Sequence, residues 1–338
     1  MDRQAPRLLA LFQKRIEGDD ALLRLAQARF REAGLGAEFY AEKPDELQWL
    51  LGFRPSSDLP VTVHLSRGIN LLSDDSRFLI AEFSRRFAHD VYGLVIHDQG
   101  AAASDLEGYL AAVNETARLL KDGPLLFIEY AVGLDPDRYL EIFRRLRDLE
   151  SVSACIDTGH VGLRQVRRRY SEIGGEDPFS LTPSDHCLSD AVDDLEEAVQ
   201  SALPVLLGLI KGTGELNKPV HFHLHDGHPL YKGAYGVSDH MSFFSEIPIP
   251  FEHKGRMILP PMYGPSGLRE IVKTSLAVLD PGLLSFSLEI HPPEGQEPLG
   301  EKESLSQHWQ DRSNAERMNH WISVLLRNQQ LLLDACRD

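Results

Sequence analysis

The sequence predicts an α/β protein built as a single (β/α)8 TIM barrel, and three observations support this prediction. Eight short apolar segments alternate with stretches of helical periodicity, which is the order of repeated βαβ units. Most of these segments are apolar on both faces, as buried parallel strands are. The runner-up architecture is an open doubly wound sheet, but no glycine-rich phosphate turn follows the first segment.

The expected strands follow one another along most of the chain. They cover residues 8–12, 37–41, 60–65, 91–97, 125–129, 152–157, 220–225 and 284–290. Helical patterns lie between them. Asp135 and Pro136 predict the start of one helix, because proline at the first turn loses no hydrogen bond. A C-terminal helix is expected at about 311–336, where apolar residues recur at helical spacing.

Connection lengths are asymmetric. Helix-to-strand connections are short, whereas two strand-to-helix connections are expected to be long, at about 158–188 and 226–265. Active sites of such barrels lie at the C-terminal ends of the strands, where these connections begin. We therefore expect one domain, 1–338, with long loops on its active face. The stretch 241–265 is interpreted either as a substrate-specific lid or as a packed surface loop.

Charge and composition narrow the functional classes. The 338 residues carry 35 Lys and Arg against 51 Asp and Glu, a net charge of −16, which argues against a nucleic-acid partner. No apolar run is long enough to span a membrane, and no secretory leader is expected. Three cysteines cannot form a disulfide framework, so a reduced, cytoplasmic protein is predicted. The sequence leaves the oligomeric state open.

Six of the expected strands end in or near a residue that can bind a metal ion. These residues are His64, His97, Glu129, Asp157 with His160, His223 with His225, and Glu289. Each alone is more simply a hydrogen-bonded structural residue or a cap. Ionisable groups beside apolar strands are costly unless paired or bound to metal, and the barrel brings all six strand ends together. The joint pattern therefore predicts a metal site.

The donors are carboxylates and imidazoles, which suit Zn²⁺, Mn²⁺, Co²⁺ or Mg²⁺ and do not choose among them. Cys155 lies two residues before Asp157. We interpret it as a small core residue and expect no cysteine among the ligands.

These residues resemble the xylose isomerase-like barrels, a superfamily that includes sugar isomerases and epimerases and the endonuclease IV group. The resemblance covers about residues 37–291 and rests on CIDTGH at 155–160, FHLHD at 222–226, Glu129 and Glu289. For an isomerase or epimerase it implies one divalent metal held by Glu129, Asp157, His223 and Glu289. Glu129 and Glu289 would then shuttle a proton through an enediolate intermediate on a sugar, polyol or sugar phosphate.

The endonuclease IV group implies an alternative, a zinc phosphoesterase with a multinuclear site. His64, His97 and His160 match further ligands of that group, and His225 is another candidate metal or substrate ligand. That group also has an Asp-x-His pair after the seventh strand. The nearest candidates here, Asp239 and His240, are adjacent, which departs from that pattern.

A basic cluster follows Asp157, with Arg164, Arg167 and Arg168 as candidate ligands for a substrate phosphate or carboxylate. The simpler interpretation is a solvated helix start with internal ion pairs.

A non-catalytic binding barrel is a third hypothesis, which no sequence feature favours. Stoichiometry separates the two enzymatic hypotheses, since about one metal favours the isomerase and two or three the hydrolase.

Overall fold

The protein is described from a computed structural model. It describes residues 5–13, 18–97, 99–120, 122–131, 134–174, 188–227, 244–245, 252–253, 256–257, 262–289 and 313–337. The chain divides into two compact units. The first comprises Met1–Asp157, Lys211–His223 and Val278–Leu288, and the second comprises Thr158–Ile210, Leu224–Ala277 and Glu289–Asp338. The prediction of one domain stays a prediction.

Eight strands close into a barrel, which confirms the predicted (β/α)8 fold class. They are β1 (Arg7–Leu11), β2 (Gly36–Ala41), β3 (Val61–Leu65), β4 (Gly93–Ile96), β5 (Leu125–Glu129), β6 (Val152–Asp157), β7 (Val220–Leu224) and β10 (Leu284–Glu289). Their order around the barrel is β1-β10-β7-β6-β5-β4-β3-β2. The neighbouring pairs from β1–β2 through β6–β7 are parallel. Each strand overlaps its predicted segment because burial on both faces marks it in the sequence.

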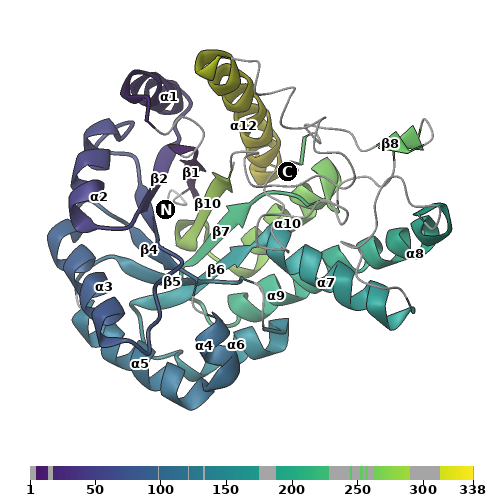
Figure 1. Cartoon of the computed structure of the whole chain (residues 1–338), viewed down its shortest axis with the longest axis horizontal. Coiled ribbons are helices and arrows are strands. Elements are labelled where there is room, and N and C mark those ends of the chain that lie inside the picture. The colour runs from purple at the N-terminus through teal and green to yellow at the C-terminus, as the bar shows by residue number, and fades with distance from the viewer. Residues whose placement is uncertain are drawn as a thin grey trace. The chain divides into compact units, whose positions relative to one another are not determined.

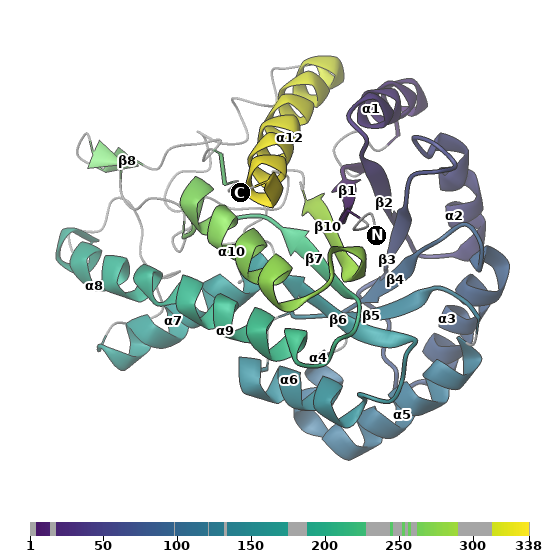
Figure 2. The same ribbon diagram turned by 180° about the vertical axis from the view of Figure 1, so that it is seen from behind.

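Helices connect the strands of the first unit. They are α1 (Asp20–Glu32), α2 (Pro44–Leu50), the 3-10 turn η2 (Leu51–Phe53), α3 (Asp74–Phe87), α4 (Gln99–Ser104), α5 (Leu106–Leu119) and α6 (Pro136–Arg145). Helix α6 begins at Pro136 after Asp135, as predicted. Figures 1 and 2 show α2, α3 and α5 around the outside of β2 to β5.

The expected loop at 158–188 is wrong for its first half. Helix α7 (Thr158–Glu172) begins directly after β6, and residues 175–187 lie outside the described residues. Leu163, Val166 and Tyr170 are buried on α7. Their spacing of three and four residues is that of one helical face, so the run of arginines between them belongs to a helix. Helices α8 (Leu188–Gln200) and α9 (Ala202–Gly214) follow before β7.

The remaining elements lie between β7 and the C-terminus. They are β8 (Glu252–His253), β9 (Arg256–Met257), α10 (Gly264–Val278), the 3-10 turn η4 (Pro281–Leu283) and α12 (Asn314–Arg337). β8 and β9 form an antiparallel pair. Most of the expected loop at 226–265 lies outside the described residues, and α12 stands where the C-terminal helix was predicted. None of the described helices is both long and apolar enough to cross a membrane.

Strand register places polar side chains on the inner face of the barrel. Tyr40 is aligned with His64, and Val95 with Phe127. Aligned residues of parallel strands point to the same face. The ring of Phe127 lies 5.2 Å from that of His221, two strands away, which identifies this face as the barrel interior. The interior therefore carries ionisable groups as well as apolar ones.

Candidate metal centre

Glu129 is the centre of the polar cluster inside the barrel. It is the last residue of β5 and only 1% exposed. Its Oε2 lies 3.0 Å from Nε2 of His64 and 2.9 Å from Nε2 of His97, while its Oε1 lies 3.4 Å from Nδ1 of His223. Three imidazoles from β3, the end of β4 and β7 thus surround one carboxylate. The structure brings together four residues that the sequence singled out.

The hydrogen bonds of His64 define which of its nitrogens faces Glu129. Nδ1 lies 3.1 Å from the main-chain oxygen of Leu65, which can only accept, so Nδ1 carries a hydrogen there. In the neutral ring, the lone pair of Nε2 then points at Oε2 of Glu129. Two lone pairs at 3.0 Å repel unless a proton or a cation lies between them. This arrangement fits a metal ligand.

His223 shows the same division of roles. Its Nε2 lies 2.9 Å from Oε1 of Glu38, and the Nδ1 atom is the one that faces Glu129. A carboxylate that accepts the other ring hydrogen is the usual support of a metal-binding imidazole. The ligand atoms of His64, Glu129 and His223 all lie within 4.8 Å of one another, close enough to hold one ion. All three residues are buried.

The electrostatics of the cluster favour ionised Glu129. Burial alone would raise the pKa of Glu129. When the facing imidazoles are protonated, the charges of His97 and His223, together with hydrogen bonds from His223 and His64, outweigh burial and hold the pKa of Glu129 well below its ordinary value. Burial is also the main cause of the lowered pKa of His97. An ionised carboxylate among imidazoles that can give up their protons is a donor set that divalent transition metals bind.

Asp157 lies beside this cluster. It ends β6, is fully buried and is aligned in register with His223, and the ligand atoms of the two lie within 4.8 Å of one another. Cys155, two residues earlier, packs in the core with Val95 and Phe127, as interpreted from the sequence. Its sulfur nevertheless lies within 4.8 Å of the ligand atoms of His221 and His223. Burial raises the pKa of this thiol above its ordinary value, which keeps it protonated.

The other predicted site residues fall in the second unit or outside the described residues. Glu289, 2% exposed, is the last residue of β10. His160 on α7 and His225 after β7 are buried, with ring centroids 5.9 Å apart. Asp239 and His240 lie outside the described residues. The strand order places β10 next to β7, and the membership of Glu289 in the site stays a prediction.

His225 is held by its own unit. Its Nδ1 lies 2.7 Å from the main-chain oxygen of Asp226, and the hydroxyl of Thr158 donates to its main-chain oxygen at 2.6 Å. Asp226 accepts hydrogen bonds from the backbone N–H groups of Gly227, Tyr263 and Gly264. A ring so fixed presents Nε2 as its acceptor atom, as His64 does.

Two buried residues of the site were not predicted from the sequence. Glu38 in β2 and His221 in β7 are 1% and 0% exposed. Nε2 of His221 lies 2.9 Å from Oε2 of Glu38. A lone carboxylate in an apolar strand was the available signal, because a buried charge needs partners. The strand pattern alone does not say that those partners lie on β7.

The candidate anion-binding arginines lie on α7. Arg168 is exposed and lies 3.7 Å from Glu172, one helical turn away. The neighbouring Arg169 pairs with Glu172 and with Glu197 of α8. Arg164 and Arg167 are half-buried. These contacts correspond to the simpler interpretation of internal ion pairs, and anion binding by Arg164, Arg167 and Arg168 stays a prediction.

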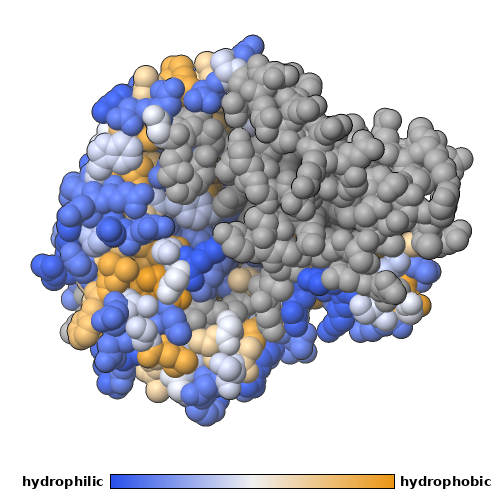
Figure 3. Space-filling view, viewed as in Figure 1, coloured by the Kyte–Doolittle hydropathy of each residue, from blue (hydrophilic) through white to orange (hydrophobic). Residues whose placement is uncertain are grey.

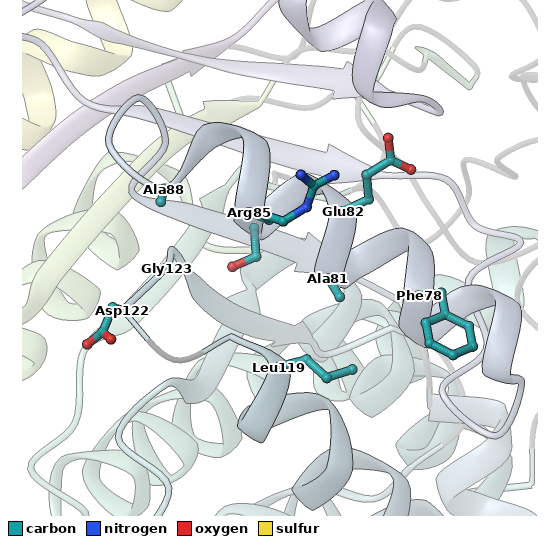
Figure 4. Close-up of a pocket in the computed structure, with 9 residues that line it drawn as sticks. Phe78, Ala81, Glu82, Arg85, Ala88, Leu119, Asp122 and Gly123 are labelled. Atoms are coloured by element: carbon teal, nitrogen blue, oxygen red, sulfur yellow. The ribbon is translucent and has the colours of Figure 1, made fainter.

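A groove on the outside of the first unit offers no comparable chemistry. The surface of the first unit is mostly hydrophilic, with apolar patches between the hydrophilic residues (Figure 3). Phe78 is 68% exposed. Figure 4 shows the groove between α3 and the turn after α5, lined by Phe78, Ala81, Glu82, Ser84, Arg85, Ala88, Leu119, Asp122 and Gly123. These residues include no histidine or cysteine and no cluster of acids. The barrel interior is therefore the stronger candidate site.

Comparisons with known proteins show similarity of structure only. No family model and no curated protein match the chain. A putative glycoside hydrolase from Parabacteroides distasonis is 10% identical, with a TM-score of 0.49 over 98% of this chain and 99% of that one. The YdjI aldolase from Escherichia coli K12 is 12% identical, with a TM-score of 0.41 over 98% and 90%. Dihydropteroate synthase from Thermus thermophilus is 15% identical, with a TM-score of 0.35 over 68% and 90%.

Such distant similarities carry no argument about activity. The resemblance to xylose isomerase-like barrels therefore stays a prediction.

Proposed function

We propose that this protein is a divalent-metal-dependent isomerase or epimerase acting on a sugar, polyol or sugar phosphate. The observation that supports the proposal best is the orientation of His223. Glu38 occupies its Nε2, so Nδ1 faces Glu129, and Asp157 lies beside it. Glu129 and Asp157, two of the ligands expected for a single-metal site, thus each lie beside His223, a third. Glu289, at the end of the next strand of the barrel, is the proposed fourth.

A bound divalent metal would supply Lewis-acid stabilisation of negative charge on the substrate's oxygens. The protein's own carboxylates would move the proton. One of Glu129 and Glu289 would remove a proton from the carbon beside the substrate carbonyl, and the other would donate its own proton to the neighbouring carbon or to the opposite face. Exchange with solvent would then restore both carboxyl groups, and in an isomerisation the hydroxyl hydrogen would also move to the former carbonyl oxygen.

The proposal is tested by exchange of the substrate's carbon-bound hydrogen. The purified protein, loaded with Mn²⁺ or Zn²⁺, is incubated in D2O with a panel of ketoses, aldoses and their phosphates, and deuterium incorporation is followed by NMR. We expect incorporation beside the carbonyl of at least one substrate, and loss of it in Glu129→Gln. Full exchange by a folded Glu129→Gln protein would exclude the proton-shuttle role.

A second candidate, a zinc phosphoesterase of the endonuclease IV type, is favoured by one observation. His64 and His97 both contact Oε2 of Glu129, whereas His223 contacts Oε1. A single-metal isomerase does not need these two imidazoles, whereas a carboxylate whose two oxygens contact different imidazoles could bridge two ions. Nicking of abasic-site DNA by the zinc-loaded protein, or about two or three zinc equivalents per chain, would favour this candidate. The net charge of −16 counts against DNA as substrate.

A further inference from the structure

Glu38 lies deep in the barrel and contacts two histidines of one strand. Its Oε1 lies 2.9 Å from Nε2 of His223, and its Oε2 lies 2.9 Å from Nε2 of His221. All three side chains are 0% exposed. β1 and β10 separate β2 from β7 around the barrel, so the carboxylate reaches across the interior.

The donor and acceptor roles in this network follow from its chemistry. An ionised carboxylate only accepts, so each imidazole donates Nε2–H to Glu38. Nδ1 of His221 is then an acceptor and lies 2.7 Å from the hydroxyl of Ser285, which can donate to it. Nδ1 of His223 is likewise an acceptor, and it is the atom that faces Glu129. One carboxylate thus determines which nitrogen of each ring carries the hydrogen.

Without Glu38, His223 has no comparable reason to present Nδ1. The Nε2–H group of His223 would then be buried without the carboxylate that accepts its hydrogen bond, and an unpaired buried donor costs free energy. The ring could lower that cost by moving its hydrogen to Nδ1, where Oε1 of Glu129 lies 3.4 Å away. That tautomer would block the nitrogen that a metal needs.

We propose that Glu38 is a positioning residue that fixes His223 in the Nε2–H tautomer, with Nδ1 directed at the metal position beside Glu129. The inference deepens the proposed function and rests on it for the role of the metal. The tautomer itself is a property of the metal-free protein. Glu38 is not among the residues proposed to hold the metal, and it acts on the metal position through His223.

Glu38→Gln makes a specific prediction because an amide has one acceptor and one donor side. Only one of the two rings can still donate Nε2–H to it. His221 can switch, since Ser285 can accept a hydrogen from its Nδ1 as well as donate one. We therefore expect His221 to change tautomer in this variant and His223 to keep its own. Glu38→Leu removes both acceptors, and there the tautomer of His223 should change.

The test is 15N NMR of the metal-free protein at pH 8.5, with imidazole resonances assigned by His221→Asn and His223→Asn variants. The wild type should show His223 as the Nε2–H tautomer, Glu38→Gln a change at His221, and Glu38→Leu a change at His223. Ser285→Ala is the matched control, because it breaks the same network beyond His221 and should leave His223 unchanged. Zinc affinity, measured against a competing chelator, should fall about 10- to 100-fold in Glu38→Leu.

Two NMR results would overturn the proposal. One is a wild-type His223 with its hydrogen on Nδ1 or on both nitrogens, and the other is a Glu38→Gln spectrum in which neither ring changes. The second result is decisive even if Glu38→Leu does not fold, because Gln preserves the size of the side chain. Failure of the wild type to bind zinc would refute the proposed function instead, and the tautomer measurement would still decide the role of Glu38.

Discussion

Nε2 of His97 lies 2.9 Å from Oε2 of Glu129, although one residue follows β4 and the other ends β5. The contact joins neighbouring strands at the same end of the barrel. His64 approaches the same oxygen from β3. Parallel strands bring their last residues to one edge, which is how residues far apart in sequence form one cluster.

Replacing Glu129 with Gln should abolish tight metal binding while leaving the barrel folded. The amide keeps the shape of the side chain but loses the charge that the three imidazoles surround. Loss of a ligand carboxylate should weaken zinc binding by at least about 100-fold, more than loss of an outer partner of a ligand does. Metal content by elemental analysis and far-UV circular dichroism measure the two effects.

Glu141→Gln is the matched control for this substitution. Glu141 is a half-exposed residue of α6. Within the described residues it forms an ion pair with Arg138. A surface pair of this kind contributes at most about 1 kcal/mol, so the variant should bind metal as the wild type does. Equal metal loss in both variants would show that Glu129 is not a ligand.

Replacing His97 with Gln tests how many ions the cluster holds. In the proposed single-metal site His97 supports Glu129, so the protein should still bind about one equivalent, with affinity reduced about 10-fold. His89→Gln, an exposed histidine on the same unit, is the control and should change nothing. A drop from two equivalents to one in His97→Gln alone would assign His97 to a second metal and favour the phosphoesterase.

The sequence predicted the strands well and the interior of the barrel only in part. β5 and β6 were found within their observed bounds because both are buried on both faces and end in a carboxylate. Glu38 was missed because its partners lie on β7, and period-two alternation says which face a residue occupies but not what it meets across the interior. Long-range contacts of this kind depend on how the barrel closes.

The helix α7 was missed for a local reason. The arginines at 167–169 lie in a predicted long connection and are interpreted from their charge as a solvated helix start, whereas Val166 and Tyr170 on either side of them are buried. The apolar positions, not the charged ones, define the periodicity of a helix on the surface of a barrel. A count of the apolar positions at three- and four-residue spacing would have found it.

Because of Lys218, the free energy of unfolding should increase as the pH rises above about 8. Its ammonium group donates to the main-chain oxygens of Leu146 and Leu149 at 2.9 and 2.7 Å, and burial lowers its pKa to about 8, against the charges of Asp148 and Glu150. The ordinary value is 10.5. Between these two pH values the unfolded chain binds more protons than the folded one, so the free energy of unfolding rises with pH.

The measurement is urea unfolding at pH 7, 8, 9 and 10 for the wild type and Lys218→Met. The difference in unfolding free energy between them should be constant below about pH 8 and then shift in favour of the wild type. Lys211→Met, at an exposed position on α9, should run parallel to the wild type throughout. A Lys218→Met curve that also runs parallel would mean that the folded and unfolded states titrate alike.

Gly159 should tolerate no side chain, because it lies against His225. A Cβ atom built on Gly159 would overlap the imidazole ring of His225, whose Nδ1 contacts the main-chain oxygen of Asp226 and whose backbone N–H donates to the hydroxyl of Thr158. Overpacking of this kind typically costs about 1–3 kcal/mol. Gly159→Ala should therefore lower the unfolding free energy by about that amount. It should also shift the NMR resonances of His225.

Gly208→Ala provides the control, since that glycine lies within α9 with nothing within 4 Å of an added Cβ. Alanine there should stabilise the helix by about 0.5–1 kcal/mol. If Gly159→Ala were as stable as Gly208→Ala, His225 would have to move freely, and it could not be a fixed ligand of any kind.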